Sequence, residues 1–146
     1  MLRRFDCSVM DPGRPAVVTS EAVTYWSELL QSSEDLELRY APLRGRRVGV
    51  HTRALGLYLA QLTALERLDC DVFLVDPALS GEPVEELRAR FRIAAIVDGM
   101  ELATFPEDEV GSGQGLVTIF TSGTTGVPKA AQHGWDGLAR PVRLGG

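Results

Sequence analysis

Four short apolar runs constrain the fold of this chain more than any other feature of its sequence. Each run is four or five residues long and bounded by polar or turn-forming residues, which is typical of strands buried on both faces. Helical patterns follow the first two runs. Apolar strands that alternate with helices predict an α/β protein with a mainly parallel sheet and helices on both faces. The runs are Arg47–His51, Val72–Val75, Ile93–Val97 and Leu116–Phe120.

Three helices are expected around these strands. The first is predicted to begin after Thr24, which can act as its N-cap, and to run to about Leu38. The second is predicted over 53–68 with Thr52 as its cap, and its apolar residues lie almost all round, so it should be buried on more than one face. The third, over 80–91, has the pattern of an amphipathic surface helix.

The remaining segments look less regular. Residues 1–22 are expected to form an extended, loop-rich arm, and residues 141–146 a tail. Residues 98–115 are acidic and rich in glycine, which predicts an exposed linker inside the folded unit 23–140. The linker contains Gly111, Gly113 and Gly115, but they precede a strand instead of following one, so they do not form the dinucleotide-binding fingerprint.

Composition excludes several classes of protein. The formal net charge is −5, from 15 basic and 20 acidic residues, which argues against binding to nucleic acid or to an anionic membrane. No apolar run is long enough to span a bilayer, and no signal peptide is evident. Cys7 and Cys70 form no Cys-x-x-Cys pair, so we assign no metal ligands and expect a cytoplasmic protein.

The fourth apolar run leads directly into Thr-Ser-Gly-Thr-Thr-Gly-Val-Pro-Lys, at residues 121–129. Glycines let a backbone turn tightly and approach a ligand, so that consecutive N–H groups can surround an anion. Hydroxyl groups add neutral donors, and the lysine adds a positive charge. The residues expected to grip a polyphosphate are Thr121, Ser122, Gly123, Thr124, Thr125, Gly126 and Lys129.

This loop is not a Walker A loop. Counting from Gly123 places Pro128 where the second glycine belongs, and Ala130 follows Lys129 where serine or threonine is required. A chance match to the eight fixed positions of the segment is on the order of 10⁻¹⁰ per start position at average residue usage.

The loop resembles the signature Thr-Ser-Gly-Thr-Thr-Gly-x-Pro-Lys of the acyl-adenylate-forming superfamily, which includes acyl- and aryl-CoA ligases, luciferases and peptide-synthetase adenylation domains. Upstream, residues 23–29 resemble the family's Leu-Thr-Tyr-x-Glu-Leu element, and 45–50 lie where the family has its first core strand. Residues 65–77 resemble a helix-then-strand segment, with Leu68-Asp69-Cys70-Asp71 replacing its small residues.

The resemblance implies that residues 23–140 are a partial AMP-binding N-terminal subdomain. The loop would hold the β- and γ-phosphates of ATP with Mg²⁺ while a substrate carboxylate attacks the α-phosphorus, with Lys129 in the catalytic role. The acyl group could then pass to CoA or to a carrier-protein thiol. The family's adenine, ribose, hinge and C-terminal lysine motifs lie downstream of the loop, and only 17 residues follow Lys129. We therefore expect the chain to be inactive alone. It could be an N-terminal piece of a longer protein, one of two complementing polypeptides, or a truncated remnant.

Two alternatives stay open. A non-catalytic scaffold or partner protein could retain a degenerate nucleotide-binding fold, and a simple phosphate-binding module would bind ATP or pyrophosphate without any dependence on an acid. The acid that is activated and the oligomeric state cannot be read from the sequence.

Four other residues invite a functional interpretation. We expect His133 to have a structural, strand-edge role, and His51 to help start the next helix, although its place at the end of a strand could also face a cleft. Asp76 and Asp98 end strands and are expected to form turns. Trp135 is expected to pack a helix that starts near Gly134.

Overall fold

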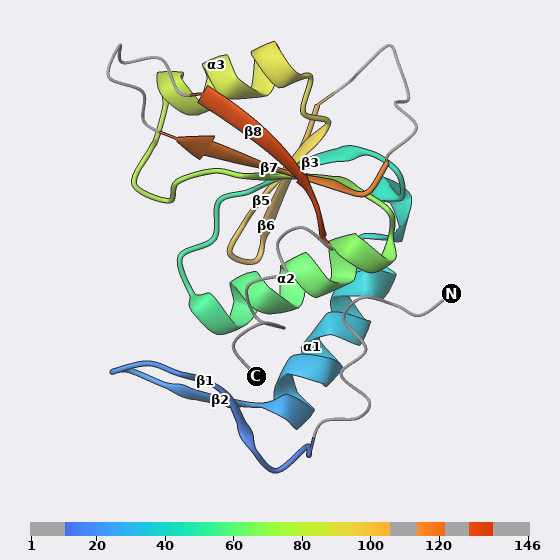
Figure 1. Ribbon diagram of the computed structural model, residues 1–146, viewed down its shortest axis with the longest axis vertical. Coiled ribbons are helices and arrows are strands. Elements are labelled where there is room, and N and C mark those ends of the chain that lie inside the picture. The colour runs from blue at the N-terminus through green and yellow to red at the C-terminus, as the bar shows by residue number, and fades with distance from the viewer. Residues whose placement is uncertain (1–10, 106–113, 122–128, 136–146) are drawn as a thin grey trace.

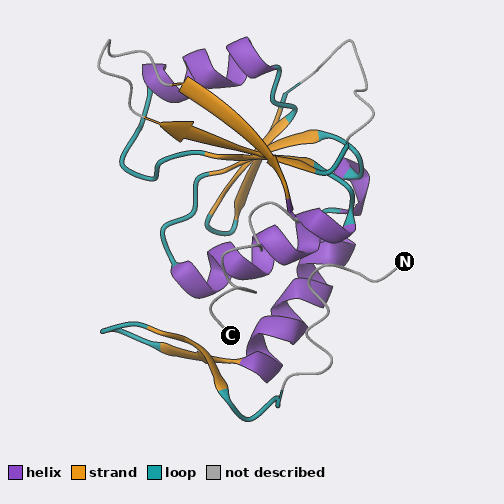
Figure 2. Ribbon diagram, in the orientation of Figure 1, coloured by secondary structure: helices purple, strands orange, loops and turns teal. Residues whose placement is uncertain are grey.

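The computed structural model describes residues 11–105, 114–121 and 129–135. These parts of the chain form three layers, with a sheet between helices (Figures 1 and 2). The helices are α1 (Trp26–Arg39), α2 (Leu55–Arg67), α3 (Glu82–Phe91) and the short 3₁₀ helix η2 (Ala41–Leu43). The strands are β1 (Pro15–Val18), β2 (Val23–Tyr25), β3 (Arg47–Val50), β4 (Asp71–Leu74), β5 (Ala95–Asp98), β6 (Glu101–Thr104), β7 (Leu116–Thr121) and β8 (Lys129–Gly134).

The main sheet has the strand order β6-β5-β3-β4-β7-β8 in the described part of the chain. The four central strands β5, β3, β4 and β7 are parallel, and they correspond to the four apolar runs of the sequence. The two outer strands, β6 and β8, are antiparallel to their neighbours. The predicted fold class, a mainly parallel sheet covered by helices on both faces, is therefore confirmed.

Alternate residues of the central strands supply the two layers of the core. Val48, Val72 and Val117 are fully buried and belong to the larger cluster, which includes the buried residues of α1 and α2. Phe73 and Ile96 point to the other face and form a smaller cluster under α3. Opposite faces at successive residues are what the pleat of a strand dictates. Figure 2 shows α3 on one side of the sheet and α1 with α2 on the other.

The linker predicted over 98–115 is wrong for residues 101–104. These residues form β6, which pairs with β5 from Ala95↔Thr104 to Asp98↔Glu101. Only Gly99 and Met100 connect the two strands, and Gly99 has a φ of 60°. A two-residue hairpin needs a residue with positive φ, and glycine accepts it without strain. Glycine at the first of the two loop positions was thus a hairpin signal, although β6 carries few buried residues. Residues 106–113 lie outside the described residues.

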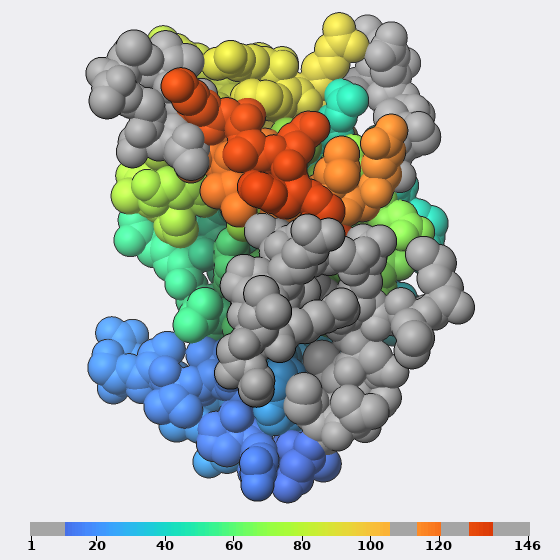
Figure 3. All heavy atoms as spheres, in the orientation of Figure 1, coloured from blue at the N-terminus to red at the C-terminus, as the bar shows by residue number. Residues whose placement is uncertain are grey.

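The arm predicted over 1–22 also contains structure in its described part. β1 pairs with β2 as an antiparallel hairpin, with Val18 opposite Val23. Thr19 forms the turn, because its hydroxyl group accepts hydrogen bonds from the N–H groups of Glu21 and Ala22. The hairpin lies at the lower end of the molecule in Figure 3, away from the main sheet.

The two predicted helix caps are wrong. Tyr25 stands at the N-cap of α1 and Ala54 at that of α2, and neither makes a side-chain cap hydrogen bond. Thr24 instead packs against α2: a Cβ built on Gly56 would lie 2.6 Å from the Thr24 hydroxyl oxygen. The Thr52 hydroxyl group instead donates a buried hydrogen bond to Gln61. Tertiary contacts therefore override the local capping preference of both threonines.

None of the helices in the described ranges is long and apolar enough to cross a membrane.

Candidate functional site

The parallel strands end together at one edge of the sheet, on the left of Figure 1. β3 leads into His51 and Thr52, β4 into Val75 and Asp76, and β7 ends at Thr121. Ligands of open α/β sheets bind outside this carboxyl edge, because the loops there are free to vary while the strands hold them in place. A ligand site is therefore expected at this edge.

The predicted polyphosphate loop begins at this edge. Thr121 is the last residue of β7 and pairs with Lys129, the first residue of β8, so the two ends of the loop are held side by side by the β7–β8 hairpin. Lys129 is exposed. The other residues assigned to the grip lie outside the described residues; they are Ser122, Gly123, Thr124, Thr125 and Gly126.

A cavity of about 450 Å³ opens beside β7 at the same edge. Its walls come from Thr52 and Arg53 in the β3–α2 connection, from Tyr58 in α2, from Asp76 in the β4–α3 connection, and from Phe120. Phe120 directly precedes Thr121, so the cavity reaches the start of the predicted loop. Cavities of this size are typical of small-molecule sites.

The position of the cavity follows from the topology. After β3 the chain turns to α2 on one face of the sheet, and after β4 it turns to α3 on the opposite face (Figure 1). The connections from two neighbouring parallel strands thus leave in opposite directions and open a crevice between them. Such a topological switch point is the usual ligand site of a doubly wound sheet.

The cavity wall carries one cation and one anion. The Arg53 guanidinium donates from Nη2 to the carbonyl oxygen of Pro77 at 3.0 Å, which ties the β3–α2 connection to the β4–α3 connection. The carboxylate of Asp76 accepts a hydrogen bond from the N–H of Ala78 at 2.9 Å. The prediction that Asp76 forms a turn is therefore confirmed. Tyr58 lies in the wall as well, and burial raises the pKa of its hydroxyl group.

His51 holds the β4–α3 connection through contacts of its imidazole ring. Its Nε2 lies 2.6 Å from the carbonyl oxygen of Leu79, and its Nδ1 lies 3.1 Å from a carboxylate oxygen of Asp98. The residue thus joins the ends of β3 and β5 to the segment before α3. It does not start α2, but it lines a second cavity together with Ser80 and Asp98, which confirms the alternative that it faces a cleft. Asp98 forms this contact as well as ending β5.

A buried polar network supports the edge on the other face. Thr52 donates from Oγ1 to Oε1 of Gln61 at 2.6 Å and accepts a hydrogen bond from the N–H of Gly99 at 3.0 Å. Gln61 donates from Nε2 to the carbonyl oxygen of Gly99 at 2.8 Å and to the Tyr40 hydroxyl at 3.3 Å. Burial raises the pKa of Tyr40, so this hydroxyl group stays protonated. The network holds the β5–β6 turn, α2 and the end of β3 together.

Asp71 sets where β7 begins. Its Oδ1 accepts hydrogen bonds from the N–H groups of Gln114 and Leu116 at 3.0 and 3.1 Å. Because Asp71 is the first residue of β4, the carboxylate fixes the register of β7 against β4, which runs from Val72↔Val117 to Leu74↔Ile119. By fixing the start of β7, Asp71 also determines where Thr121 lies at the other end of that strand.

The other sequence-based assignments fall outside the site. His133 is exposed in the edge strand β8, opposite Val117, so its predicted strand-edge position is confirmed. Trp135 is buried in the larger core cluster, and the residues of the helix that it was predicted to pack, beyond Trp135 itself, lie outside the described residues. Cys70 is fully buried, and burial raises the pKa of its thiol to about 11. Among the described residues, no group of three His, Cys, Asp or Glu side chains could hold a metal ion.

Sequence reasoning missed Arg53, Gln61 and Asp71. Arg53 comes just after a buried parallel strand, where functional side chains gather, but the sequence alone does not show that this strand ends at a switch point. Gln61 lies in the middle of a helical pattern and Asp71 at the start of an apolar run, and neither position marks a partner that is distant in the sequence.

Comparisons with known proteins agree with this architecture. No protein-family model and no curated protein matches the sequence. Among solved structures, the chain is similar to O-succinylbenzoate coenzyme A synthetase from Bacillus subtilis in complex with AMP, with a TM-score of 0.69 and 16% identity over 99% of this chain and 46% of that one. It is also similar to the N-terminal subdomain of Klebsiella oxytoca NpsA in complex with 3-hydroxyanthranilyl-AMSN, with a TM-score of 0.68 and 16% identity over 88% of this chain and 38% of that one.

A third structure, apo MatB from Rhodopseudomonas palustris, gives a TM-score of 0.69 at 16% identity over 95% of this chain and 35% of that one. This chain therefore has the fold of the N-terminal subdomain of adenylate-forming ligases, as the resemblance of its loop had led us to expect. It spans less than half the length of each of these three structures.

Proposed function

We propose that this chain is the N-terminal portion of an ATP-dependent, AMP-forming carboxylic-acid ligase, and that residues 121–129 hold the triphosphate of ATP. The observation that carries the proposal is the place of the loop. The segment that resembles the superfamily signature begins at the carboxyl end of β7, beside a cavity at the switch point of the sheet. Structures of this fold include one with AMP and one with the acyl-adenylate intermediate OSB-AMP.

In the proposed reaction, a carboxylate oxygen of the substrate attacks the α-phosphorus of ATP. A new bond forms between that oxygen and phosphorus, the bond to the bridging oxygen of the β-phosphate breaks, and pyrophosphate leaves with the electron pair. The Lys129 ammonium would stabilise the charge on the β- and γ-phosphates, and the loop would orient them. Thr121 and Lys129 are adjacent in the β7–β8 register, so the groups at the two ends of the loop start from a fixed separation.

Mg²⁺ is expected to enter with the nucleotide, because this ion is usually held by substrate phosphates, water and one or two protein oxygens, and it supplies charge neutralisation. The Asp76 carboxylate at the cavity and the hydroxyl groups of the loop are oxygen donors of the required kind. After adenylate formation, transfer of the acyl group to CoA or to a carrier-protein thiol would complete a ligase reaction, either within a longer chain or with a second chain.

Lys129 provides a direct test, because it is the only lysine in the 146-residue sequence. Amine acetylation followed by mass spectrometry reports its accessibility, and the α-amino group of the same chain serves as the internal reference. We expect MgATP and magnesium pyrophosphate to protect Lys129 but not the α-amino group. AMP should protect it less, because it lacks the β- and γ-phosphates.

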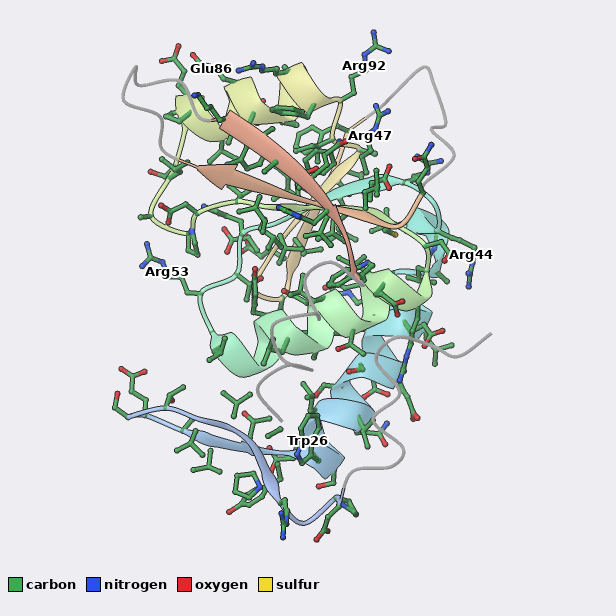
Figure 4. The ribbon with its side chains drawn as sticks, viewed as in Figure 1. Trp26, Arg44, Arg47, Arg53, Glu86 and Arg92 are labelled. Carbon is green, nitrogen blue, oxygen red and sulfur yellow. The ribbon has the colours of Figure 1, made fainter. Side chains whose placement is uncertain are left out.

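A matched pair of variants tests the role of the charge. Lys129→Gln should weaken pyrophosphate binding, measured by calorimetry, by roughly tenfold or more, because a hydrogen bond to a charged group contributes about 1.5–3 kcal/mol. Arg44→Gln removes the same charge at the opposite end of the sheet (Figure 4) and should leave binding unchanged. Absence of any binding or protection in the unmodified chain would refute the proposal.

Acid-dependent exchange of pyrophosphate into ATP would distinguish a ligase from the alternative of a non-catalytic scaffold. The assay is run with a panel of carboxylic acids on the chain together with a polypeptide that supplies the later part of the fold. Exchange that requires both an acid and Lys129 supports the ligase. Nucleotide binding without exchange under any acid favours the scaffold.

A further inference from the structure

We propose that Arg53 is a second phosphate-contacting side chain, which faces the ligand from the opposite side of β7 to Lys129. The proposal rests on the proposed function and adds a residue that the loop does not contain. Its ligand is the pyrophosphate part of a nucleoside triphosphate, or free pyrophosphate. Arg53 comes from the β3–α2 connection and lines the cavity beside Phe120.

The chemistry of the cavity wall favours an anionic ligand at Arg53. The wall has both apolar and polar residues, and Arg53 is the cation among them. The guanidinium is exposed and held in place by the hydrogen bond from Nη2 to Pro77. A guanidinium has five N–H donors in a planar fork, which matches the oxygens of a phosphate group. An anchored fork loses less conformational freedom on binding than a mobile side chain does.

Asp76 is the competing charge in this wall. Its carboxylate is engaged by the N–H of Ala78 in its own turn, at 2.9 Å. It therefore has a structural partner, and it can also serve as an oxygen donor to a hydrated cation that accompanies a polyphosphate. The wall thus offers one group to the phosphate oxygens and one to the counter-ion.

The strand order places Arg53 and Lys129 on two sides of a common space. Lys129 begins β8, and the β3–α2 connection lies three strands away, across β7 and β4. Strands are about 4.8 Å apart, so the two backbones are separated by about 14 Å. Two long side chains that extended into this space from both sides would narrow the gap to the scale of a polyphosphate. Figure 4 shows Arg53 at the edge where the β3–α2 connection leaves the sheet.

Calorimetric titrations with pyrophosphate, ATP and AMP, each with Mg²⁺, test the proposal on the full chain. Arg53→Gln should weaken binding of pyrophosphate and ATP by roughly tenfold or more and leave AMP binding within about twofold. Arg53→Lys keeps the charge but not the planar fork of donors, so its affinity for pyrophosphate should lie between those of the unmodified chain and Arg53→Gln. Arg44→Gln has the same change in charge and is the control, and thermal unfolding of each variant checks that the fold is retained.

Salt dependence provides a readout that a merely structural role would not change. Loss of a phosphate-contacting cation should make the fall of pyrophosphate affinity with salt concentration shallower for Arg53→Gln but not for Arg44→Gln, because screening acts on the charge that was removed. Protection of Lys129 from acetylation by pyrophosphate should also require a higher pyrophosphate concentration in Arg53→Gln.

The outcomes separate this inference from the proposed function. If Lys129→Gln weakens pyrophosphate binding and Arg53→Gln does not, the role of Arg53 is overturned while the loop retains its function. If the unmodified chain binds neither pyrophosphate nor ATP, both fail. If Arg53→Gln weakens the binding of AMP as strongly as the binding of pyrophosphate, Arg53 does not contact the β- and γ-phosphates and the inference is overturned.

Discussion

Replacement of Gln61 by leucine should destabilise the fold by about 3 kcal/mol, although the two side chains are similar in size. Gln61 is fully buried in α2. It takes part in three hydrogen bonds, with Thr52, Gly99 and the Tyr40 hydroxyl. Each of these hydrogen bonds contributes about 1 kcal/mol net, and leucine leaves the buried Thr52 and Tyr40 hydroxyl groups and the partly buried Gly99 carbonyl group without their partner.

The network also predicts how two substitutions combine. Thr52→Val removes the hydrogen bonds to Gln61 and from Gly99, so it should cost about 2 kcal/mol. The Thr52–Gln61 bond is counted in both single variants. The double variant should therefore cost about 4 kcal/mol instead of the additive value of about 5, which leaves a coupling energy of about 1 kcal/mol.

Urea unfolding followed by tryptophan fluorescence measures these free energies. Gln31→Leu is the control, because Gln31 is exposed on α1 and bonds only to Asp35 within the described residues, so it should change stability by less than about 0.5 kcal/mol. A cost below about 1 kcal/mol for Gln61→Leu, or simple additivity with Thr52→Val, would refute the network as a source of stability.

Three further predictions follow from contacts elsewhere in the fold. Gly56→Ala should destabilise the native chain, because the new Cβ would lie 2.6 Å from the Thr24 hydroxyl oxygen. In a chain that also carries Thr24→Ala, the same substitution should stabilise the fold by about 0.5–1 kcal/mol, because alanine favours a helix more than glycine does. The same cost in both backgrounds would contradict this reasoning. Burial raises the pKa of the Cys70 thiol to about 11 in the fold, against an ordinary value of 9.0. Stability should therefore fall by an amount on the order of 2 kcal/mol as the pH rises from about 9 to 11, and unfolding curves of Cys70→Val should show a smaller fall. Asp71→Ala leaves two N–H groups at the start of β7 without their acceptor and should cost about 1–2 kcal/mol in thermal or urea unfolding, whereas Asp71→Asn retains a carbonyl oxygen and should recover part of that loss.

The central strands could be predicted from the sequence because each is buried on both faces. A run such as Val72–Val75 contains only apolar residues, and the structure buries nearly every one of them. The antiparallel edge strands could not be predicted in the same way. β6 and β8 are mostly exposed, so their sequences carry little periodic hydrophobicity, and only the pairing with a neighbour defines them as strands.

The candidate site shows a similar division. The loop over 121–129 could be proposed as a phosphate grip from its residue types and its resemblance to a family signature, and this role stays a prediction. Arg53 could not, because one arginine after a strand is common, and its meaning comes from the switch point that β4 and α3 create around it. The failed cap at Thr52 has a related cause: a buried glutamine nine residues later in the chain offers its hydroxyl group a better partner than the backbone of α2.

The polar residues at the carboxyl edge of the sheet therefore divide by how deeply they are buried. Thr52 is satisfied inside the protein, so its substitution should lower stability without changing the affinity of the folded chain for pyrophosphate. Arg53 and Lys129 are exposed at the same edge, so their substitution should lower affinity with little effect on unfolding. Paired measurements of unfolding and pyrophosphate binding on Thr52→Val and Arg53→Gln test this separation. Parallel losses of stability and affinity in both variants would mean that the edge is a single structural unit without a distinct ligand-facing part.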